Sequence, residues 1–279
     1  MMRRMPGPAS PVLTSAANPR VKAAIALRDR RERDRLGLTL VDGTRELRRA
    51  LDAGATVPEA FVCEPLLAGV DARAVLDGLE AGGAIVHSVS ESLLRKLAFG
   101  ERLEGVVGVV RIPPLELARL TLTDDPIVVV IEGVEKPGNV GAVLRSVDGA
   151  GADALIAADP RTDLFNPNVV RASAGTVFSV PIAAASTGAT LVWLAARGLR
   201  ILAARVDGER LYSDVDLSGP LAIALGAEAD GLSAAWTAPG IEGVRLPMLG
   251  IADSLNLSVT AAILLYEARR QRGVPGRRL

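Results

Sequence analysis

The chain contains an uninterrupted apolar run, Ile127-Val128-Val129-Val130-Ile131, which ends at the acidic residue Glu132. A strand with one face in water alternates apolar and polar side chains, whereas a parallel strand covered by helices on both faces is apolar throughout. The run therefore predicts a central strand of a parallel sheet.

Strand-like runs separated by helical patterns continue towards the C-terminus. Further strands are expected at residues 154–157, 177–182, 201–206, 221–225 and 244–246. The last helix is expected from Ser254 to Arg272, with an apolar stripe formed by Leu255, Val259, Ala262 and Tyr266. Gly273 and Pro275 end it. This order predicts an α/β domain in which helices cover both faces of a parallel sheet.

A smaller α/β domain is expected on the N-terminal side of this sheet. Its strands are expected at residues 38–41, 60–63, 84–89 and 105–112, and its helices at 45–53, 72–80 and 92–98. A basic helix from Asn18 to Arg35 precedes them. We expect a flexible leader at residues 1–17, a first domain at 18–112, a linker at 113–125 and a second domain at 126–279.

Composition excludes several classes of protein. A length of 279 residues favours two domains, and 49% hydrophobic with 23% charged residues is typical of a soluble protein. Cys63 is the only cysteine and His87 the only histidine, which removes disulfide frameworks, Cys/His zinc sites and most triads with a histidine base. No metal site is expected. Neither a membrane span nor a secretory signal is visible, so the cytoplasm is the expected location.

The net charge is zero, but basic residues gather at both ends of the chain. From Met1 to Arg35 there are nine basic and three acidic residues, a local charge of +6. Five more arginines follow residue 268, namely Arg269, Arg270, Arg272, Arg277 and Arg278. Such clusters attract phosphates, although solvated helix faces and tails are often charged without binding anything.

Three loops that follow predicted strands carry unusual residues, and ligands of parallel sheets bind at the carboxyl ends of strands. The loops are residues 132–146, residues 226–233 and the segment from Leu246 to Ser258. The third crowds Asp253, Ser254, Asn256 and Ser258 onto a helix start, where one capping residue would suffice. A dinucleotide fold is disfavoured, because Gly138 and Gly141 do not have the Gly-x-Gly-x-x-Gly spacing.

Together the loops resemble those of the TrmH-like branch of the SPOUT methyltransferases, over roughly residues 126–272. The first loop carries Asn139, Gly141, Arg145 and Ser146, and the second carries Gly226, Glu228, Gly231, Leu232 and Ser233. The third carries Leu246-Pro247-Met248 and Ser254-Leu255-Asn256-Leu257-Ser258. Around residues 40–47 the first domain is similar to the L30e-like substrate-recognition domain of some family members.

The resemblance implies a deep trefoil knot, an exception to the rule that chains are not knotted. It also implies that S-adenosylmethionine binds, bent, among Gly226, Leu246 and Leu255, and that the protein methylates a ribose 2′-hydroxyl of RNA. Its catalytic residues would be Asn139, Arg145, Glu228, Ser254 and Asn256. A guanidinium does not lose its proton in proteins, so Arg145 is expected to bind phosphate and stabilise alkoxide charge. Glu228 is expected to hold loop N–H groups or to pair with Arg145.

The implied partners are a second copy of the chain and structured RNA, with 23S ribosomal RNA favoured over transfer RNA. Arg28, Arg30 and Arg31 of the basic helix are expected to contact RNA together with Arg145. With aromatic residues at 3%, phosphate, ribose and shape recognition should dominate over base stacking. A non-catalytic RNA-binding protein of the same fold is the alternative from a different class.

Overall fold

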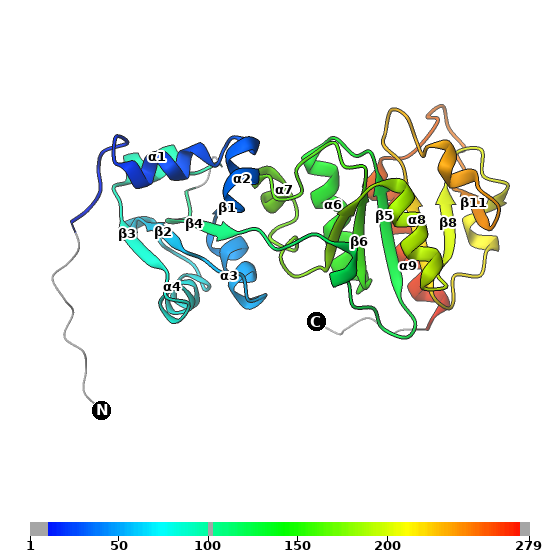
Figure 1. Ribbon diagram of the computed structural model, residues 1–279, viewed down its shortest axis with the longest axis horizontal. Helices are drawn as coiled ribbons and strands as arrows, with labels where there is room; N and C mark the ends of the chain where they lie inside the picture. Colours follow the sequence, from blue (N-terminus) through cyan, green and yellow to red (C-terminus); the bar gives the residue numbers. More distant parts are fainter. Residues whose placement is uncertain (1–10, 100–102, 274–279) are drawn as a thin grey trace. The chain divides into compact units, whose positions relative to one another are not determined.

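The computed structural model describes residues 11–99 and 103–273. The chain forms two compact units (Figure 1). Unit 1 extends to Pro113 and includes the short segment Phe165–Arg171. Unit 2 comprises Pro114–Leu164 and Ala172 onwards. Each unit has its own sheet, as the alternation of strands and helices along the sequence predicts.

The sheet of unit 2 is parallel throughout and has seven strands in the order β7-β6-β5-β10-β8-β11-β9. The strands are β5 (Ile127–Glu132), β6 (Ala154–Ala158), β7 (Ile182–Ala185), β8 (Arg200–Ala204), β9 (Arg210–Leu211), β10 (Leu221–Leu225) and β11 (Ile241–Arg245). Every residue of β5 is buried, and β5 lies between β6 and β10. The prediction of a central parallel strand is therefore confirmed.

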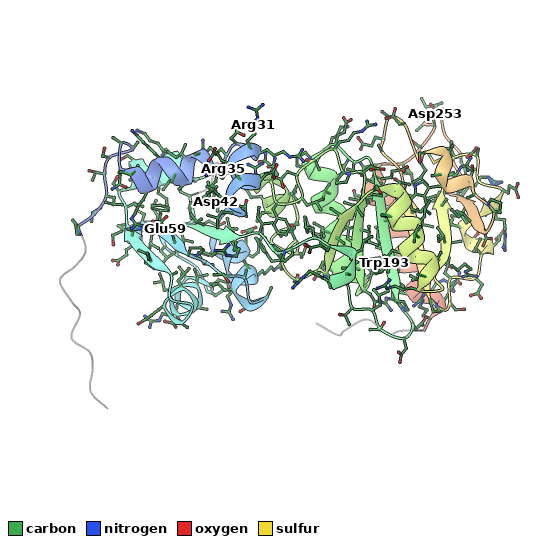
Figure 2. All side chains as sticks on the ribbon, in the orientation of Figure 1. Arg31, Arg35, Asp42, Glu59, Trp193 and Asp253 are labelled. Carbon is green, nitrogen blue, oxygen red and sulfur yellow. The ribbon has the colours of Figure 1, made fainter. Side chains whose placement is uncertain are left out.

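Helices cover both faces of this sheet. The helix α8 (Thr187–Ala196) places Trp193 and Leu194 in a core cluster with Val128 and Val130 of β5 (Figure 2). The helices α6 (Pro137–Ala150) and α9 (Leu257–Gln271) pack against each other, and α9 lies behind the sheet when α8 is in front (Figure 1). This is the predicted three-layer arrangement, whereas the implied knot stays a prediction.

Unit 1 contains a four-stranded sheet in the order β1-β4-β2-β3. Its strands are β1 (Leu38–Asp42), β2 (Glu59–Val62), β3 (Ile85–Ser88) and β4 (Val106–Arg111), of which only the β2–β3 pair is parallel among the described residues. Its helices are α1 (Pro19–Ala26), α2 (Arg30–Leu36), α3 (Thr44–Asp52), α4 (Ala72–Ala81) and α5 (Glu91–Leu97). The short helix α7 (Pro167–Ala172) and four 3₁₀ turns at Glu64–Leu66, Leu117–Arg119, Tyr212–Asp214 and Ala234–Thr237 complete the described elements.

The segment expected to be a flexible leader is partly anchored. Residues 1–10 lie outside the described residues, but Leu13 N donates to Ser88 O at 2.8 Å and Leu13 O accepts from Ser90 N at 3.0 Å. Leu13 also packs against the core of unit 1. The described end of this segment therefore belongs to the fold of unit 1.

Several expected elements differ in the structure, among them β11, which begins at Ile241 and not at residue 244, and α9, which begins at Leu257 and not at Ser254. The basic helix is two helices, because the Asp29 side chain accepts from Arg31 N at 2.7 Å and starts α2 as its N-cap. The strand expected at residues 177–182 begins only at Ile182, because residues 173–179 form turns. In these turns Thr176 N donates to Ser173 O, and Val180 N donates to Thr176 O. The two-residue strand β9 has no sequence signal.

The face of α9 that is buried is not the apolar stripe named from the sequence. The helix buries Leu257, Ala261, Leu264, Leu265 and Ala268. The expected apolar stripe instead points outward, with Leu255, Val259 and Tyr266 39%, 45% and 55% exposed. The sequence contains this apolar stripe, but in a single chain its side chains lie on the solvent-exposed surface.

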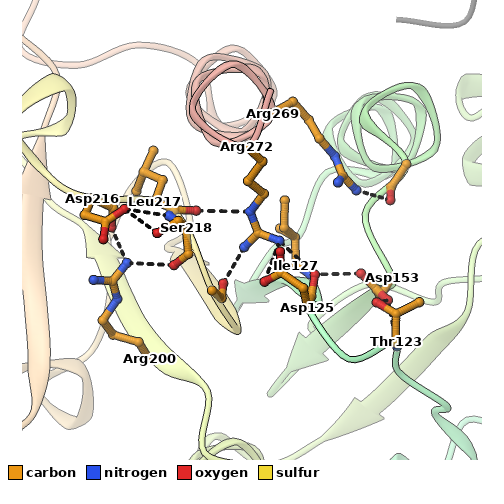
Figure 3. A network of polar contacts seen from close by, with 12 residues as sticks. Thr123, Asp125, Ile127, Asp153, Arg200, Asp216, Leu217, Ser218, Arg269 and Arg272 are labelled. Carbon is orange, nitrogen blue, oxygen red and sulfur yellow. Dashed lines mark hydrogen bonds and ion pairs between the residues drawn. The ribbon is translucent and has the colours of Figure 1, made fainter. Parts of the chain in front are cut away.

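The C-terminal end of α9 is tied to the amino edge of the sheet (Figure 3). Arg272 donates to the carbonyls of Asp125, Leu217 and Gly219, and its side chain is only 4% exposed. Arg269 donates to the carbonyls of Ala150 and Gly151. Burial lowers the pKa of Arg272 from its usual value. These arginines serve the fold and not a phosphate site, while Arg277 and Arg278 lie outside the described residues.

Candidate functional site

The three polar loops meet at the carboxyl ends of β5, β10 and β11, as predicted. A cavity of about 1090 Å³ opens there and is lined by the second and third loops and by the end of β8. Its wall includes Gly226, Glu228, Leu246, Leu255 and Asn256. Ser254 also lines it. All three residues proposed to hold a cofactor therefore share one cavity with three of the five proposed catalytic residues.

A hydrogen-bonded cluster joins the three loops beside this cavity. Glu228 Oε1 accepts from Asn139 Nδ2 at 2.6 Å and from Asn256 Nδ2 at 2.8 Å. Asn256 Nδ2 also lies 3.3 Å from Asn139 Oδ1. Lys136, just before α6, forms an ion pair with Glu228. Asn139 is 89 positions from Glu228 and 117 positions from Asn256, so these hydrogen bonds hold distant loops in fixed positions relative to one another.

The contacts of Glu228 determine whether its carboxylate can accept a proton. Hydrogen bonds from Lys136 first, and then from Asn139, hold the pKa of Glu228 below its usual value. A carboxylate with a lowered pKa and three donors is a poor proton acceptor. Glu228 therefore organises the loops. The expected pair with Arg145 is absent among the described residues, because Lys136 and the two asparagines occupy the carboxylate.

Arg145 lies apart from this cluster. It follows Asn139 by six residues on α6, which places it about 9 Å further along the helix axis and on a different side. Within residues 11–99 and 103–273, its exposed side chain has no hydrogen-bond or ion-pair partner. A single chain thus leaves this guanidinium available for an anion.

A second carboxylate, Glu132 at the end of β5, is buried beneath the loops. It accepts from Ser233 N at 2.7 Å, from Ser233 Oγ at 2.9 Å and from Thr187 Oγ1 at 2.5 Å. Burial acts to raise the pKa of Glu132, but the hydrogen bonds from Ser233 and Thr187 outweigh it and keep the pKa below its usual value. Glu132 fixes the end of the second loop to the sheet.

Two motif glycines are required by close packing. A Cβ atom on Gly226 would lie 2.0 Å from Gly231 C, because the second loop folds back on itself. A Cβ atom on Gly141 would lie 2.4 Å from Ala172 Cβ. Gly226 thus shapes the cavity wall, whereas Gly141 allows α6 to approach the segment after α7.

The polar crowd at the start of α9 divides into two groups. Asn256 is the N-cap, and its Oδ1 accepts from Ser258 N at 2.9 Å and from Ser258 Oγ at 2.7 Å. Asp253, labelled in Figure 2, and Ser254 are both exposed, and among the described residues neither caps the helix. One residue caps the helix, as predicted, and the others are free to face a ligand.

The arginines proposed to contact RNA are not equivalent. Arg28 donates to the carbonyls of Lys96 and Ala98, both at 2.8 Å, and stacks over Phe99. Arg30 lies 3.5 Å from Asp34. Arg31 is exposed and points away from unit 1 (Figure 2). Arg31 is therefore best placed for a phosphate, whereas Arg28 caps α5.

Other site types receive no support. Across the part of the chain that the structure describes, no three His, Cys, Asp or Glu side chains are grouped to hold a metal ion. No described helix combines the length and the apolar character that crossing a bilayer needs.

Residues 126–266 match the SpoU rRNA Methylase family, which is half of the chain. The chain belongs to the SpoU rRNA methylase family. The first part of this SpoU methylase, residues 18–108, matches the MRM3-like substrate binding domain. Both matches agree with the resemblance seen in the three loops and around residues 40–47.

Similar proteins extend over nearly the whole SpoU methylase. The 23S rRNA (uridine(2479)-2′-O)-methyltransferase of Streptomyces viridochromogenes is 34% identical over 88% of this chain and 87% of its own length. A crystal structure of an RNA 2′-O ribose methyltransferase is 42% identical, with a TM-score of 0.82 over 94% of this chain and 99% of that one. The SpoU methyltransferase AviRb from Streptomyces viridochromogenes, in complex with the cofactor AdoMet, is 31% identical, with a TM-score of 0.82 over 91% and 99% of the two chains.

Sequence reasoning missed three residues of the site. Lys136 and Glu132 stand at the edges of the first loop, and their partners Glu228 and Ser233 lie far away in the sequence. Arg245, at the end of β11, also lines the cavity. A signal existed for Glu132, since an acidic residue directly after a buried strand needs a partner.

Proposed function

We propose that this protein transfers a methyl group from S-adenosylmethionine to a ribose 2′-hydroxyl of 23S ribosomal RNA. The observation that carries the proposal is the cavity beside the Asn139–Glu228–Asn256 cluster at the carboxyl ends of the strands. Its support is membership of the SpoU family and the names of the relatives, which act on 23S ribosomal RNA.

The cavity wall suits a bent adenosine derivative. Leu246 and Leu255 offer hydrocarbon, while the folded loop from Gly226 to Leu232 presents backbone groups that an adenine edge can bond. The lack of a Cβ on Gly226 lets the loop close at this point. Bound there, S-adenosylmethionine supplies an electrophilic methyl group on a sulfonium.

The protein itself has to place the ribose hydroxyl in line and to stabilise the oxygen as it loses its proton. We assign two roles to Arg145, which are to bind the phosphate next to the target ribose and to stabilise the negative charge that develops on the ribose oxygen. Its guanidinium can do this because it is exposed and has no partner among the described residues. Asn139 and Asn256 are proposed to orient the ribose, with the help of Ser254. Glu228 holds both amides in place.

The active form is proposed to be a homodimer. Leu255, just before α9, and Val259 and Tyr266 on α9 are exposed apolar residues, and α9 packs against α6, the helix that carries Arg145. Covering these residues with a second copy removes them from water, and it brings one chain's Arg145 to the partner copy. The separation of Arg145 from Asn139 within one chain favours such shared sites.

Unit 1 is proposed to select the RNA. Its match to a substrate binding domain and the exposed Arg31 on α2 support this role. A cytoplasmic location follows from a ribosomal substrate.

The first experiment measures tritium transfer from labelled S-adenosylmethionine to purified 23S ribosomal RNA and, separately, to bulk transfer RNA. Label in 23S ribosomal RNA at a mapped 2′-O-methyl nucleotide is the expected result. Label in transfer RNA alone would show that transfer RNA, and not 23S ribosomal RNA, is the substrate. Cofactor binding without label in either RNA would favour the binding-only alternative.

A further inference from the structure

Four of the six charged side chains that line the cavity are paired with a residue of opposite charge. Arg205 pairs with Asp207 at 2.6 Å, Glu228 pairs with Lys136, and Asp230 lies 3.2 Å from Arg161. Two lining charges have no ion-pair partner among the described residues, namely Arg245 and Asp253. The cavity wall therefore holds one uncompensated positive charge and one uncompensated negative charge.

These two charges differ in their surroundings. Asp253 is exposed at the outer end of the third loop (Figure 2), where water solvates it. Arg245 is partly buried, and its Nη1 atom is buried with no hydrogen-bond partner among the described residues. An unpaired buried donor on a charged group is costly, and native structures rarely leave one without a reason.

The position of Arg245 narrows the class of ligand that its charge and its other donors, Nε and Nη2, could bind. It is the last residue of β11 and directly precedes Leu246, so it stands where the third loop leaves the sheet. Its guanidinium offers a planar fork of donors, which matches a carboxylate in a bidentate pair. Adenosine and the sulfonium carry no negative charge, so the only anionic group of S-adenosylmethionine is the carboxylate of its methionine part.

We propose that Arg245 binds the methionine carboxylate of the cofactor and so anchors the end opposite the adenine. This inference rests on the proposed function, because it assumes that the cavity binds S-adenosylmethionine. It adds a residue outside the three loop motifs to the binding site. It also explains why this arginine has no ion-pair partner among the described residues, although four other charged residues of the cavity wall have one.

The test compares two ligands that differ in the carboxylate. S-adenosylhomocysteine keeps the amino-acid part, whereas 5′-methylthioadenosine lacks it. Binding of both is measured by calorimetry, without RNA, for the full chain and for Arg245→Met and Arg245→Lys. Arg210→Met is the matched control, since Arg210 lies on the adjacent strand β9, pairs with Glu242 and does not line the cavity.

Loss of a charged hydrogen bond should weaken S-adenosylhomocysteine binding by Arg245→Met about tenfold to a hundredfold. Binding of 5′-methylthioadenosine should change less than about twofold, which also shows that the variant is folded. Arg245→Lys should lie between Arg245→Met and the unchanged protein. Equal losses for both ligands, or no loss for either, would overturn the proposal.

Failure of the proposed function gives a different result. In that case the unchanged protein binds neither ligand, and both proposals fall. A loss confined to RNA affinity in Arg245→Met, with S-adenosylhomocysteine binding intact, would instead assign the guanidinium to an RNA phosphate and overturn only the carboxylate assignment.

Discussion

Glu132 and Ser233 are 101 residues apart in the sequence, and the carboxylate of the first accepts both the backbone N–H and the hydroxyl of the second. This contact fixes the end of the second loop to the end of β5. Because Glu132 is buried and also accepts from Thr187, it connects the loop, the sheet and the start of α8.

Replacing this carboxylate should loosen the cavity wall. Glu132→Ala leaves the N–H of Ser233 without its partner, and we expect the free energy of unfolding to fall by about 2–3 kcal/mol. S-adenosylhomocysteine binding should weaken with it. Urea unfolding and calorimetry measure the two effects. Glu135→Gln is the control, because Glu135 forms an exposed pair with Arg161 and should change stability by less than about 1 kcal/mol.

Arg145→Ala should abolish methyl transfer and leave S-adenosylhomocysteine binding within a few-fold. The reason is that Arg145 does not line the cavity and is assigned to the RNA side. Tritium transfer and calorimetry check the two halves of this prediction. A variant that no longer binds the cofactor product would show that the role assigned to Arg145 is wrong.

Charge reversal should separate Arg31 from Arg28. Arg31→Glu should weaken RNA binding and flatten its dependence on salt while leaving stability unchanged, because the side chain makes no contact that supports unit 1. Arg28→Glu should instead lower the unfolding temperature, since two carbonyls at the end of α5 lose their donor. Salt titrations of RNA affinity and thermal unfolding distinguish the two. Equal salt slopes for Arg31→Glu and the unchanged protein would place the RNA elsewhere.

Acid should destabilise the chain partly through Glu267 on α9. Arg270 first, and then Gln271, lower the pKa of Glu267 from 4.5 to about 2. A carboxylate with a lowered folded-state pKa contributes stability above its unfolded pKa and loses it as the pH falls through the folded value. Glu267→Gln should therefore show a shallower loss of stability between about pH 4.5 and pH 2, by about 1 kcal/mol or less for this surface pair. Parallel curves for both proteins would contradict it.

The sequence predicted the elements that a strong local pattern specifies. The run at Ile127 is apolar on both faces, and it forms a central strand as expected. The break between α1 and α2 was missed because Asp29 reads equally well as one charge on a basic helix or as an N-cap. The buried face of α9 could not be predicted, since two apolar stripes run along it and only packing shows which one is buried.

The site was predictable to the extent that it depends on sheet edges. Loops after parallel strands have to meet, so Asn139, Glu228 and Asn256 could be placed near one another. The sequence could not show whether Lys136 or Arg145 pairs with Glu228, because both residues follow the same strand. Nor could the sequence show that Arg245 lacks a partner, since that depends on every neighbour at once.

The helix α9 is held at both ends, by Asn256 at the cluster beside the cavity and by Arg272 at the opposite edge of the sheet. It spans fifteen residues, about 22 Å, between these two contacts. A helix with polar contacts at both ends is expected to shift less than the loops beside it when a ligand enters. A change in the width of the cavity mouth is expected instead in the loops that line it, among them residues 226–232 and the stretch between β11 and the first turn of the helix. Entry and exit of the cofactor are therefore expected to depend on the loops at the carboxyl ends of the strands, while α9 keeps its place.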